Sequence, residues 1–508
     1  MKHIIICTII SLVLSPLAVC SQPGTQISEK QFASELDAYI RLGMATVPEL
    51  PSVAMVVVKD DKPIFMRAYG MANKETGIKA DADTLYYIAS STKSYMALAA
   101  ALLDREGKIK LSEPFTKYAP GVTFKTSIPD KVTVQDLLTH TSALRNSPMV
   151  WRTAFSGEID DKDIMRVLAD GTSYNDENYG KYAYTNLGYN IYGQLVKLST
   201  GKKWQDVLQE RVFGPLKLKH TTAYVSKARA KFALAESYLF SPDTGTVMRS
   251  PIDKQDNNMQ AAGGMLTSLN DLGRWLSVNM NNGRLDGKQV IPADVMQMVH
   301  TGYTDTTRDQ PPFTGNGKYG LGWQMGRYRD ENVVYHHGGY AGWSSHISYM
   351  PDKKIGVAVM INESTAGGRI GHLLATYAYD RWLGTDTNES YAKQLQDISG
   401  QYGKMKQQMI ASVKSRSTRT SQLTRPLAEY AGRYSNDMLG NIDIAVEGNT
   451  LGVRMGYVHV VSTPFTQKET IRVEMTPGEG VVIQFETDGA GKVSSLTYAG
   501  LKFARVVR

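Results

Sequence analysis

Strand patterns lie near both ends of a region that extends from residue 27 to about residue 383, and helical patterns fill the interval. Val53–Val58 is a compact apolar run that ends at a turn, as is typical of a buried strand. Near the other end, His346–Met350 and Ile355–Ile361 are predicted to pair around the turn between them. This arrangement favours an α+β fold in which the first and last strands share one sheet.

Length and composition place the chain among ordinary globular proteins. Its 508 residues suggest two to four domains at about 100–200 residues each. Hydrophobic residues make up 42% and charged residues 21%, which excludes collagen, coiled coil and long disorder for most of the chain. The net charge of +8 is spread along the sequence without a basic run, so we predict no nucleic-acid partner.

The sequence changes character after the first region. Residues 384–425 hold a polar segment compatible with a helix, Gln394–Lys414, and then a polar run without apolar periodicity, so we interpret them as a linker. Short alternating strands separated by turns follow: Asn441–Val446, Leu451–Met455, Ile471–Met475, Val481–Phe485 and Val493–Tyr498. A small antiparallel β domain, barrel-like in form, is therefore predicted over residues 426–508.

The N-terminus has the pattern of a secretory signal peptide, which we assign to residues 1–20. Lys2 gives a basic start, Ile4–Leu17 is apolar, and small residues follow. The apolar stretch is shorter than the about 20 residues of a spanning helix, so a retained membrane anchor is the less favoured alternative. We expect an exported protein, periplasmic or secreted.

Both cysteines, Cys7 and Cys20, lie in this N-terminal segment. Cleavage after Cys20 leaves a mature protein without cysteine, which excludes disulfides and thiolate catalysis. The alternative is a lipoprotein anchored through a lipid on Cys20, because Leu17–Cys20 is similar to that signal, although Val19 fits it poorly. No later segment is long and apolar enough to cross a membrane.

Several common mechanisms lack their motifs. The sequence contains no G-x-S-x-G, no H-E-x-x-H and no G-x-x-x-x-G-K-[ST]. The nine histidines are scattered, and the adjacent His336 and His337 point to opposite faces of a strand, which makes them a poor metal pair. We therefore expect neither a metal nor an organic cofactor.

A serine and a lysine remain as candidates for nucleophilic catalysis. Ser90 and Lys93 form S-x-x-K at the start of a predicted helix that ends before Gly107. Residues three apart on a helix share one face, so the amine can take the hydroxyl proton if burial lowers its pKa. The alternative is a helix cap followed by solvated residues. Ser199–Lys202 also fits the pattern, but it lies where a helix is predicted to end.

Two further segments carry groups suited to such a site. Tyr184 and Asn186 lie two residues apart on an extended turn and face the same way, as a phenolic base or acid and an amide that holds a carbonyl or the lysine. His337 and Gly339 lie in a glycine-rich stretch that leads into the last strand pair. Glycines let a substrate backbone approach a sheet edge. The alternatives are a surface loop rich in tyrosine and a glycine bulge with a solvated histidine.

In this order, the three segments resemble the serine β-lactamase and penicillin-binding-protein superfamily, whose motifs are S-x-x-K, Y-x-N and K/H-x-G. The chain is most similar to the branch of class C β-lactamases, family VIII esterases and D-aminopeptidases. Four further stretches support the resemblance, which covers residues 27–383: Thr133–Ser142, Val212–Leu216, Ala262–Met265 and Tyr319–Trp323. Leu427–Tyr434 is similar to the start of the lipocalin-like domain often attached to such hydrolases.

The resemblance implies a fold and a set of roles. The fold is an antiparallel sheet flanked by helices, with an all-helical part. Ser90 would form the acyl-enzyme, with Lys93 and Tyr184 sharing the general base and acid roles. Asn186, His337 and Gly339 would bind substrate, and the backbone N–H groups of Ser90 and Tyr340 would form the oxyanion hole.

Three positions qualify this assignment. His337 occupies the position at which class C β-lactamases carry lysine, so strong antibiotic hydrolysis is not expected. Ala143 replaces the usual glycine after Thr141–Ser142, a change confined to a turn. The stretch that holds His140 is structural in the family, so His140 is left out of the catalytic set.

The sequence therefore predicts an exported serine hydrolase that cleaves small esters, amides or peptides through an acyl-enzyme on Ser90. Two alternatives stay open. One is a D-Ala-D-Ala carboxypeptidase or weak β-lactamase with the same residues, and the other is a non-catalytic ligand-binding protein on the same fold.

Overall fold

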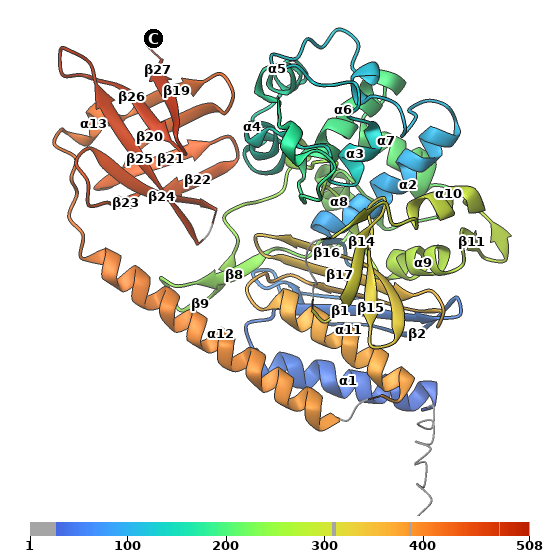
Figure 1. Cartoon of the computed structure of the whole chain (residues 1–508). Helices are drawn as coiled ribbons and strands as arrows, with labels where there is room; N and C mark the ends of the chain where they lie inside the picture. The colour runs from blue at the N-terminus through green and yellow to red at the C-terminus, as the bar shows by residue number, and fades with distance from the viewer. Residues whose placement is uncertain (1–26, 307–310, 386–387, 477, 507–508) are drawn as a thin grey trace, which may run out of the picture.

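A computed structural model describes residues 27–306, 311–385, 388–476 and 478–506 of the chain. The predicted signal peptide, with Cys20, lies outside the described residues. Two parts are visible in Figure 1: a large part built on a central sheet, and a smaller all-β part at the C-terminus.

The central sheet has nine antiparallel strands in the order β13-β14-β15-β16-β17-β18-β1-β2-β3. Their bounds are β1 Ser52–Lys59, β2 Lys62–Asn73, β3 Ile78–Lys79, β13 Thr304–Asp305, β14 Thr314–Tyr319, β15 Gln324–Tyr328, β16 Glu331–Tyr340, β17 Trp343–Met350 and β18 Ile355–Ile361. β1 pairs with β18 from Val53 opposite Ile361 to Lys59 opposite Ile355. This pairing confirms the prediction that the first and last strands of the region share one sheet.

β1 is apolar from Val53 to Val58, as expected of a strand in a sheet that is covered on both faces. Val53, Met55 and Val57 enter one buried cluster, whereas Ala54 and Val56 enter the other. Helices α1 (Glu29–Thr46) and α11 (Gly367–Leu383) pack on the first face (Figure 1). Side chains that alternate between two hydrophobic layers are expected of a strand buried on both sides.

The other face carries the all-helical part. Its helices are α2 Thr92–Arg105, α3 Val134–Leu138, α4 Ser147–Trp151, α5 Asp161–Gly171, α6 Leu187–Thr200, α7 Trp204–Leu208, α8 Val225–Lys231, α9 Leu269–Met280 and α10 Ala293–Val299. Short strands connect them: β4 Tyr86–Tyr87, β5 Leu144–Arg145, β6 Ser173–Tyr174, β7 Thr221–Thr222, β8 Tyr238–Ser241, β9 Thr246–Arg249, β10 Leu266–Thr267, β11 Arg284–Leu285 and β12 Lys288–Gln289. The expected helix after Ser90 is α2, and it is buried along nearly its whole length.

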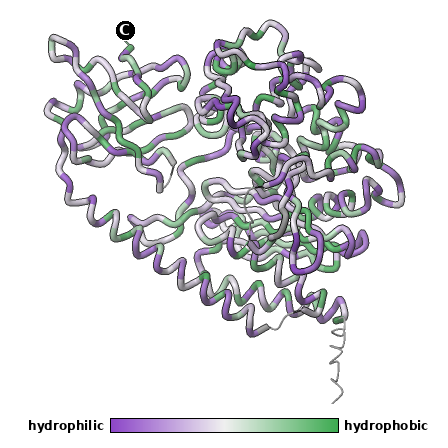
Figure 2. The backbone as a smooth tube through the Cα atoms, viewed as in Figure 1, coloured by the Kyte–Doolittle hydropathy of each residue, from purple (hydrophilic) through white to green (hydrophobic). Residues whose placement is uncertain are grey.

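Most of the segment interpreted as a linker is a single helix, α12 (Asn388–Ser417). Hydrophilic and hydrophobic residues alternate along it in Figure 2. Tyr391, Leu395 and Tyr402 are buried in the same cluster as residues of α1 and α11. The first half of α12 thus belongs to the packing of the large part, a role that its overall polarity concealed.

The C-terminal part is a nearly closed, barrel-like antiparallel sheet in the order β22-β21-β20-β19-β27-β26-β25-β24-β23, preceded by the short α13 (Leu427–Tyr430). The strand bounds are β19 Gly432–Asn436, β20 Gly440–Glu447, β21 Thr450–Met455, β22 Val458–Val461, β23 Thr463–Pro464, β24 Thr470–Thr476, β25 Glu479–Thr487, β26 Val493–Tyr498 and β27 Leu501–Arg505. The five strands predicted from alternation are β20, β21, β24, β25 and β26.

The barrel contacts the helical part at α4 and the single turn of π-helix that follows it, Arg152–Ser156 (η3). The Tyr457 N–H donates to the Ser156 carbonyl over 2.8 Å. Trp151 Nε1 lies 3.1 Å from Met455 Sδ. Within the part of the chain that the structure describes, no helix has both the length and the apolar character needed to cross a membrane.

Candidate active site

Ser90 lies in a single 3₁₀ turn, Ala89–Ser91 (η1), directly before α2. Ala89 has a φ of 45°, a left-handed conformation that alanine rarely adopts. Ser91 bonds to Ser345 Oγ on β17 over 3.0 Å, and Ser345 Oγ donates to the Ile88 carbonyl over 2.8 Å. These contacts hold the strained turn against the sheet, as is common at functional sites.

Lys93 lies one helical turn after Ser90 and is completely buried. Its Nζ lies 3.1 Å from Ser90 Oγ and donates over 2.8 Å to both Asn186 Oδ1 and the Ala262 carbonyl. Burial lowers the pKa of the Lys93 ammonium well below its usual range. A neutral amine has two N–H bonds, which the two oxygens accept, so its lone pair faces the Ser90 hydroxyl.

Tyr184 and Asn186 lie on the loop that leads into α6, and Asn186 is the residue before its first turn. The Tyr184 ring lies 4.9 Å from Lys93 Nζ and lines the same cavity as Ser90. Burial raises the pKa of the Tyr184 phenol, whereas its contact with the Ser90 hydroxyl acts in the opposite direction. The phenol is therefore protonated at neutral pH, and the predicted Ser90, Lys93, Tyr184 and Asn186 meet around one point.

His140 supports this loop through hydrogen bonds to the residues on either side of Tyr184. Its Nδ1 accepts the Thr185 N–H over 3.3 Å, and its carbonyl accepts the Ala183 N–H over 2.9 Å. Its ring lies 4.5 Å from the Tyr184 ring. His140 is a positioning residue, since it touches the loop on both sides of Tyr184. Its φ of 63° explains the sharp bend that lets it do so.

The structure assigns the imidazole beside Ser90 to His336, and not to His337. The His336 ring lies 6.2 Å from the Tyr184 ring, and its Nε2 lies 3.2 Å from the Tyr319 hydroxyl. Burial and the nearby Lys93 lower the pKa of His336 to about 3, so the ring is neutral. His337 also lines the cavity, but its ring contacts His372 on the other face of β16. Neighbouring residues on a strand face opposite ways. Shifting the K/H-x-G motif by one residue therefore exchanges the two histidines between the two faces of β16.

The same shift applies to the glycines. A Cβ on Gly338 would lie 2.0 Å from the Ile88 carbonyl oxygen, so only glycine lets β16 approach the turn that carries Ser90. A Cβ on Gly339 would meet nothing within 4 Å. Gly339 does line the cavity, as predicted, but the close approach is made at Gly338.

The hydrogen-bonding pattern of β16 favours Gly339 over the predicted Tyr340 as the strand donor of an oxyanion hole. Tyr340 pairs with Trp343 across a two-residue turn, and such a closing pair turns its N–H and carbonyl groups inward to each other. Alternate residues turn outward. The His337 carbonyl accordingly accepts from His336 Nδ1, at 2.8 Å, and the Gly339 N–H faces the cavity. Gly339 therefore replaces Tyr340 as the strand donor that would accompany the Ser90 N–H.

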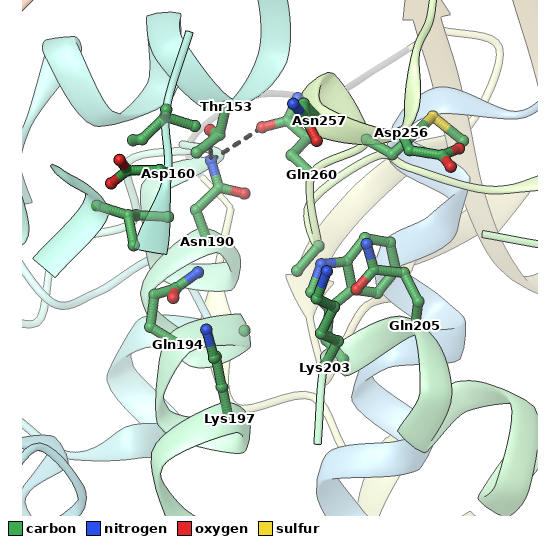
Figure 3. Close-up of a pocket in the computed structure, with 16 residues that line it drawn as sticks. Thr153, Asp160, Asn190, Gln194, Lys197, Lys203, Gln205, Asp256, Asn257 and Gln260 are labelled. Carbon is green, nitrogen blue, oxygen red and sulfur yellow. Dashed lines mark hydrogen bonds between the residues drawn. The ribbon is translucent and has the colours of Figure 1, made fainter. Parts of the chain in front are cut away.

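The edge of β16 is open beside Ser90 because β15 pairs only with residues 331–335. A cavity of about 620 Å³ lies against this edge, lined by Ser90, Tyr184, Gln324 and residues 336–341 among others. A smaller cavity of about 130 Å³ lies next to α6 (Figure 3). Asn190 lines the small cavity, where it donates to Thr153 and Gln260, and its Oδ1 accepts the N–H of Ala262, whose carbonyl binds Lys93. The small cavity lacks Ser90 among its lining residues, so we place the site at the larger one.

The second S-x-x-K lies outside this arrangement. Ser199 is in the last turn of α6, and the Lys202 amine binds the exposed Glu210 carboxylate. The structure thus separates the two copies of the motif by burial: Lys93 is enclosed with its serine, and Lys202 is not.

Comparison with known proteins agrees with the fold and the site. The sequence model of the Beta-lactamase family matches residues 36–376, about two thirds of the chain, and the protein belongs to this family of serine hydrolases. Unguisins hydrolase ungD of Aspergillus violaceofuscus is 24% identical over 433 residues, covering 78% of this chain and 74% of that protein. Protein flp of Staphylococcus aureus is 24% identical, covering 62% of this chain and 60% of that protein.

Solved structures extend the likeness to more than nine tenths of the chain. The octameric penicillin-binding protein homologue from Pyrococcus abyssi superposes with a TM-score of 0.59 at 21% identity, covering 93% of this chain and 99% of that one. SurE superposes with a TM-score of 0.55 at 17% identity, covering 94% of this chain and 99% of SurE. At these identities the likeness concerns the fold, and it includes the C-terminal barrel as well as the hydrolase part.

Proposed function

We propose that the protein is an exported serine hydrolase that cleaves small esters, amides or peptides through an acyl-enzyme on Ser90. The observation that carries the proposal is the environment of Lys93. Its amine is buried, is held by two carbonyl-type acceptors and lies 3.1 Å from Ser90 Oγ. These are the features of a lysine tuned to act as a base.

The reaction runs in two steps. The Ser90 oxygen attacks the substrate carbonyl while its proton passes to Lys93 Nζ, and the developing oxyanion is held by the N–H groups of Ser90 and Gly339. The C–O or C–N bond then breaks, and the leaving group takes the proton by way of the Tyr184 hydroxyl. Water then attacks the acyl-enzyme and gives a proton to Lys93. As the bond between the acyl carbon and the Ser90 oxygen breaks, Lys93 passes that proton to the Ser90 oxygen and the acid is released.

The charge of the cavity favours neutral substrates. None of its described lining residues is a lysine, arginine or carboxylate, and His336 is neutral because burial lowers its pKa. A substrate carboxylate next to the scissile bond, as in β-lactams and D-Ala-D-Ala peptides, would find no permanent cation there. We therefore rank ester or neutral amide cleavage above carboxypeptidase or β-lactamase activity.

Labelling with a fluorophosphonate tests the nucleophile. We expect the purified wild type to take up one label, and Ser90→Ala to take up none. Ser199→Ala is the matched control, since it removes the serine of the exposed S-x-x-K and should label like the wild type. Equal labelling of wild type and Ser90→Ala would refute the proposal and would favour a non-catalytic binding protein.

A substrate panel tests the ranking. We expect p-nitrophenyl ester turnover by the wild type to exceed nitrocefin turnover by at least about tenfold, with Ser90→Ala as the blank. Faster nitrocefin turnover would instead favour the β-lactamase alternative. Mass spectrometry of the mature N-terminus tests export, because cleavage after residue 20 and a lipid on Cys20 give different masses.

A further inference from the structure

A cluster of three histidines lies on the face of β16 opposite Ser90. His337 on β16 is directly opposite His346 on β17, and His372 approaches both from α11. The His337 ring lies 4.9 Å from the His346 ring and 4.1 Å from the His372 ring. One nitrogen atom from each ring can be chosen so that all three lie within 4.8 Å of one another.

Three ring nitrogens of this cluster are buried without a hydrogen-bond partner. Nδ1 and Nε2 of His337 and Nδ1 of His346 have no hydrogen-bond partner among the described residues. Buried polar atoms in folded proteins nearly always have a hydrogen-bond or metal partner. Three unpartnered nitrogens side by side therefore indicate that a bound partner belongs at this place.

His346 carries the support expected of a metal ligand. Its Nε2 lies 2.7 Å from Ser348 Oγ, which lies 2.8 Å from the Tyr379 hydroxyl. A ligand histidine usually engages its second ring nitrogen in this way, which fixes the ring and leaves the first nitrogen free for the ion. The Phe313 ring, 5.6 Å from His346 and 6.3 Å from His337, shields the cluster on another side.

The helix α11 packs close to β17, and this brings the third histidine to the cluster. Gly371 lies over His346, where a Cβ would be 3.9 Å from the His346 Cβ, so the helix packs close to β17. The next residue, His372, is then within reach of both strand histidines. His336, the neighbour of His337 in sequence, faces the other side of β16 and is not part of this cluster. The partners of His337 come from a cross-strand neighbour and a distant helix.

We propose that His337, His346 and His372 form a binding site for a divalent transition-metal ion of the zinc type. Three imidazoles with one open position are a common ligand set for zinc, and neutral nitrogen donors disfavour magnesium and calcium. Tetrahedral zinc needs nitrogens about 3.3 Å apart, which rotation of the His337 and His372 rings would supply. His337 and His372 also line the large cavity, so water there would occupy the fourth position.

Metal content tests the site directly. We expect the full-length chain without a polyhistidine tag, treated with chelator and then loaded with Zn²⁺, to retain one zinc ion per chain after gel filtration. His346→Gln and His372→Gln should each lose at least about 90% of that zinc. His459→Gln is the matched control, since His459 pairs with Glu447 in the barrel and should leave zinc content unchanged.

Two further measurements separate loss of metal from loss of fold. Zn²⁺ should raise the unfolding temperature of the wild type and of His459→Gln, but not of His346→Gln, while all three unfold alike in chelator. Co²⁺ bound to the wild type should give the visible absorption bands of a tetrahedral nitrogen site, a readout that needs no variant. Wild type that retains no zinc, or variants that retain it fully, would overturn the proposal.

Discussion

At the scale of single residues, the proposed catalysis depends on how Lys93 is kept uncharged. A buried ammonium loses its hydration, and the groups around Lys93 Nζ are two neutral oxygens and a serine hydroxyl rather than a carboxylate. Lowering the pKa of the amine therefore extends its basic form to lower pH. The pKa of Tyr184 is shifted in the opposite direction, since burial raises the pKa of its phenol. In the proposed mechanism the lysine is therefore the base of the free enzyme, and the tyrosine is its acid.

The acylation rate of the wild type should rise with pH as Lys93 loses its proton and then level off, at a lower pH than an ordinary lysine would allow. Lys93→Arg, which cannot lose its proton, should lower the rate about 10²–10⁴-fold and remove this rise. Tyr184→Phe should keep the rise while lowering the rate. Single-turnover kinetics against pH would check this, and an unchanged profile in Lys93→Arg would exclude the amine as the base.

The histidines show what a sequence can settle at this scale. The residue types and the order of the three segments were sufficient to bring Ser90, Lys93, Tyr184 and Asn186 together. They were not sufficient to choose between His336 and His337. The motif K/H-x-G fits this stretch in two ways, one residue apart, because it contains two adjacent histidines followed by two adjacent glycines. The choice was fixed by the pairing of His337 with His346, a contact between strands that periodicity does not reveal.

At the scale of elements, the site depends on how closely β16 approaches the turn η1. Ser91 binds Ser345 on the neighbouring strand β17, and Gly338 leaves the space between β16 and η1. The catalytic helix α2 is thereby held against a sheet edge that is itself open to the cavity. Strands and helices with strong patterns, such as β1, β18 and α2, were predictable. The packing of α12 on the large part is not evident from the sequence, because only scattered residues along it, Tyr391 among them, are apolar.

Gly338→Ala should lower the unfolding temperature by several degrees, since its Cβ would lie 2.0 Å from the Ile88 carbonyl oxygen and neither backbone can yield cheaply. Label uptake at Ser90 should fall with it. Gly339→Ala is the control for stability, because its Cβ would enter open space and its unfolding temperature should stay close to that of the wild type. Thermal unfolding of both variants tests this prediction. An equal drop in unfolding temperature for the two variants would mean that the close approach of β16 to η1 at Gly338 is not needed.

At the scale of the whole molecule, the barrel is connected to the cavity wall through the segment α4–η3. The barrel residue Tyr457 donates to the Ser156 carbonyl on one side of this segment. On the other side, the Ala154 carbonyl accepts from the Tyr340 hydroxyl and from the buried Lys254 amine. Tyr340 lines the cavity next to Gly339. Loosening the barrel should therefore disturb a wall of the site without touching Ser90.

Gly456→Ala would separate the barrel from this segment, because its Cβ would lie 2.1 Å from the Ser156 carbonyl oxygen. Gly448→Ala is a matched control: both glycines have positive φ, 57° and 60°, so both variants carry a strain of about 1 kcal/mol, but nothing lies within 4 Å of the Gly448 position. Hydrogen exchange over residues 147–156 should speed up only in Gly456→Ala, and its ester turnover should fall with label stoichiometry unchanged. If both variants behave alike, backbone strain within the barrel is the whole effect, and the docked barrel does not shape the cavity.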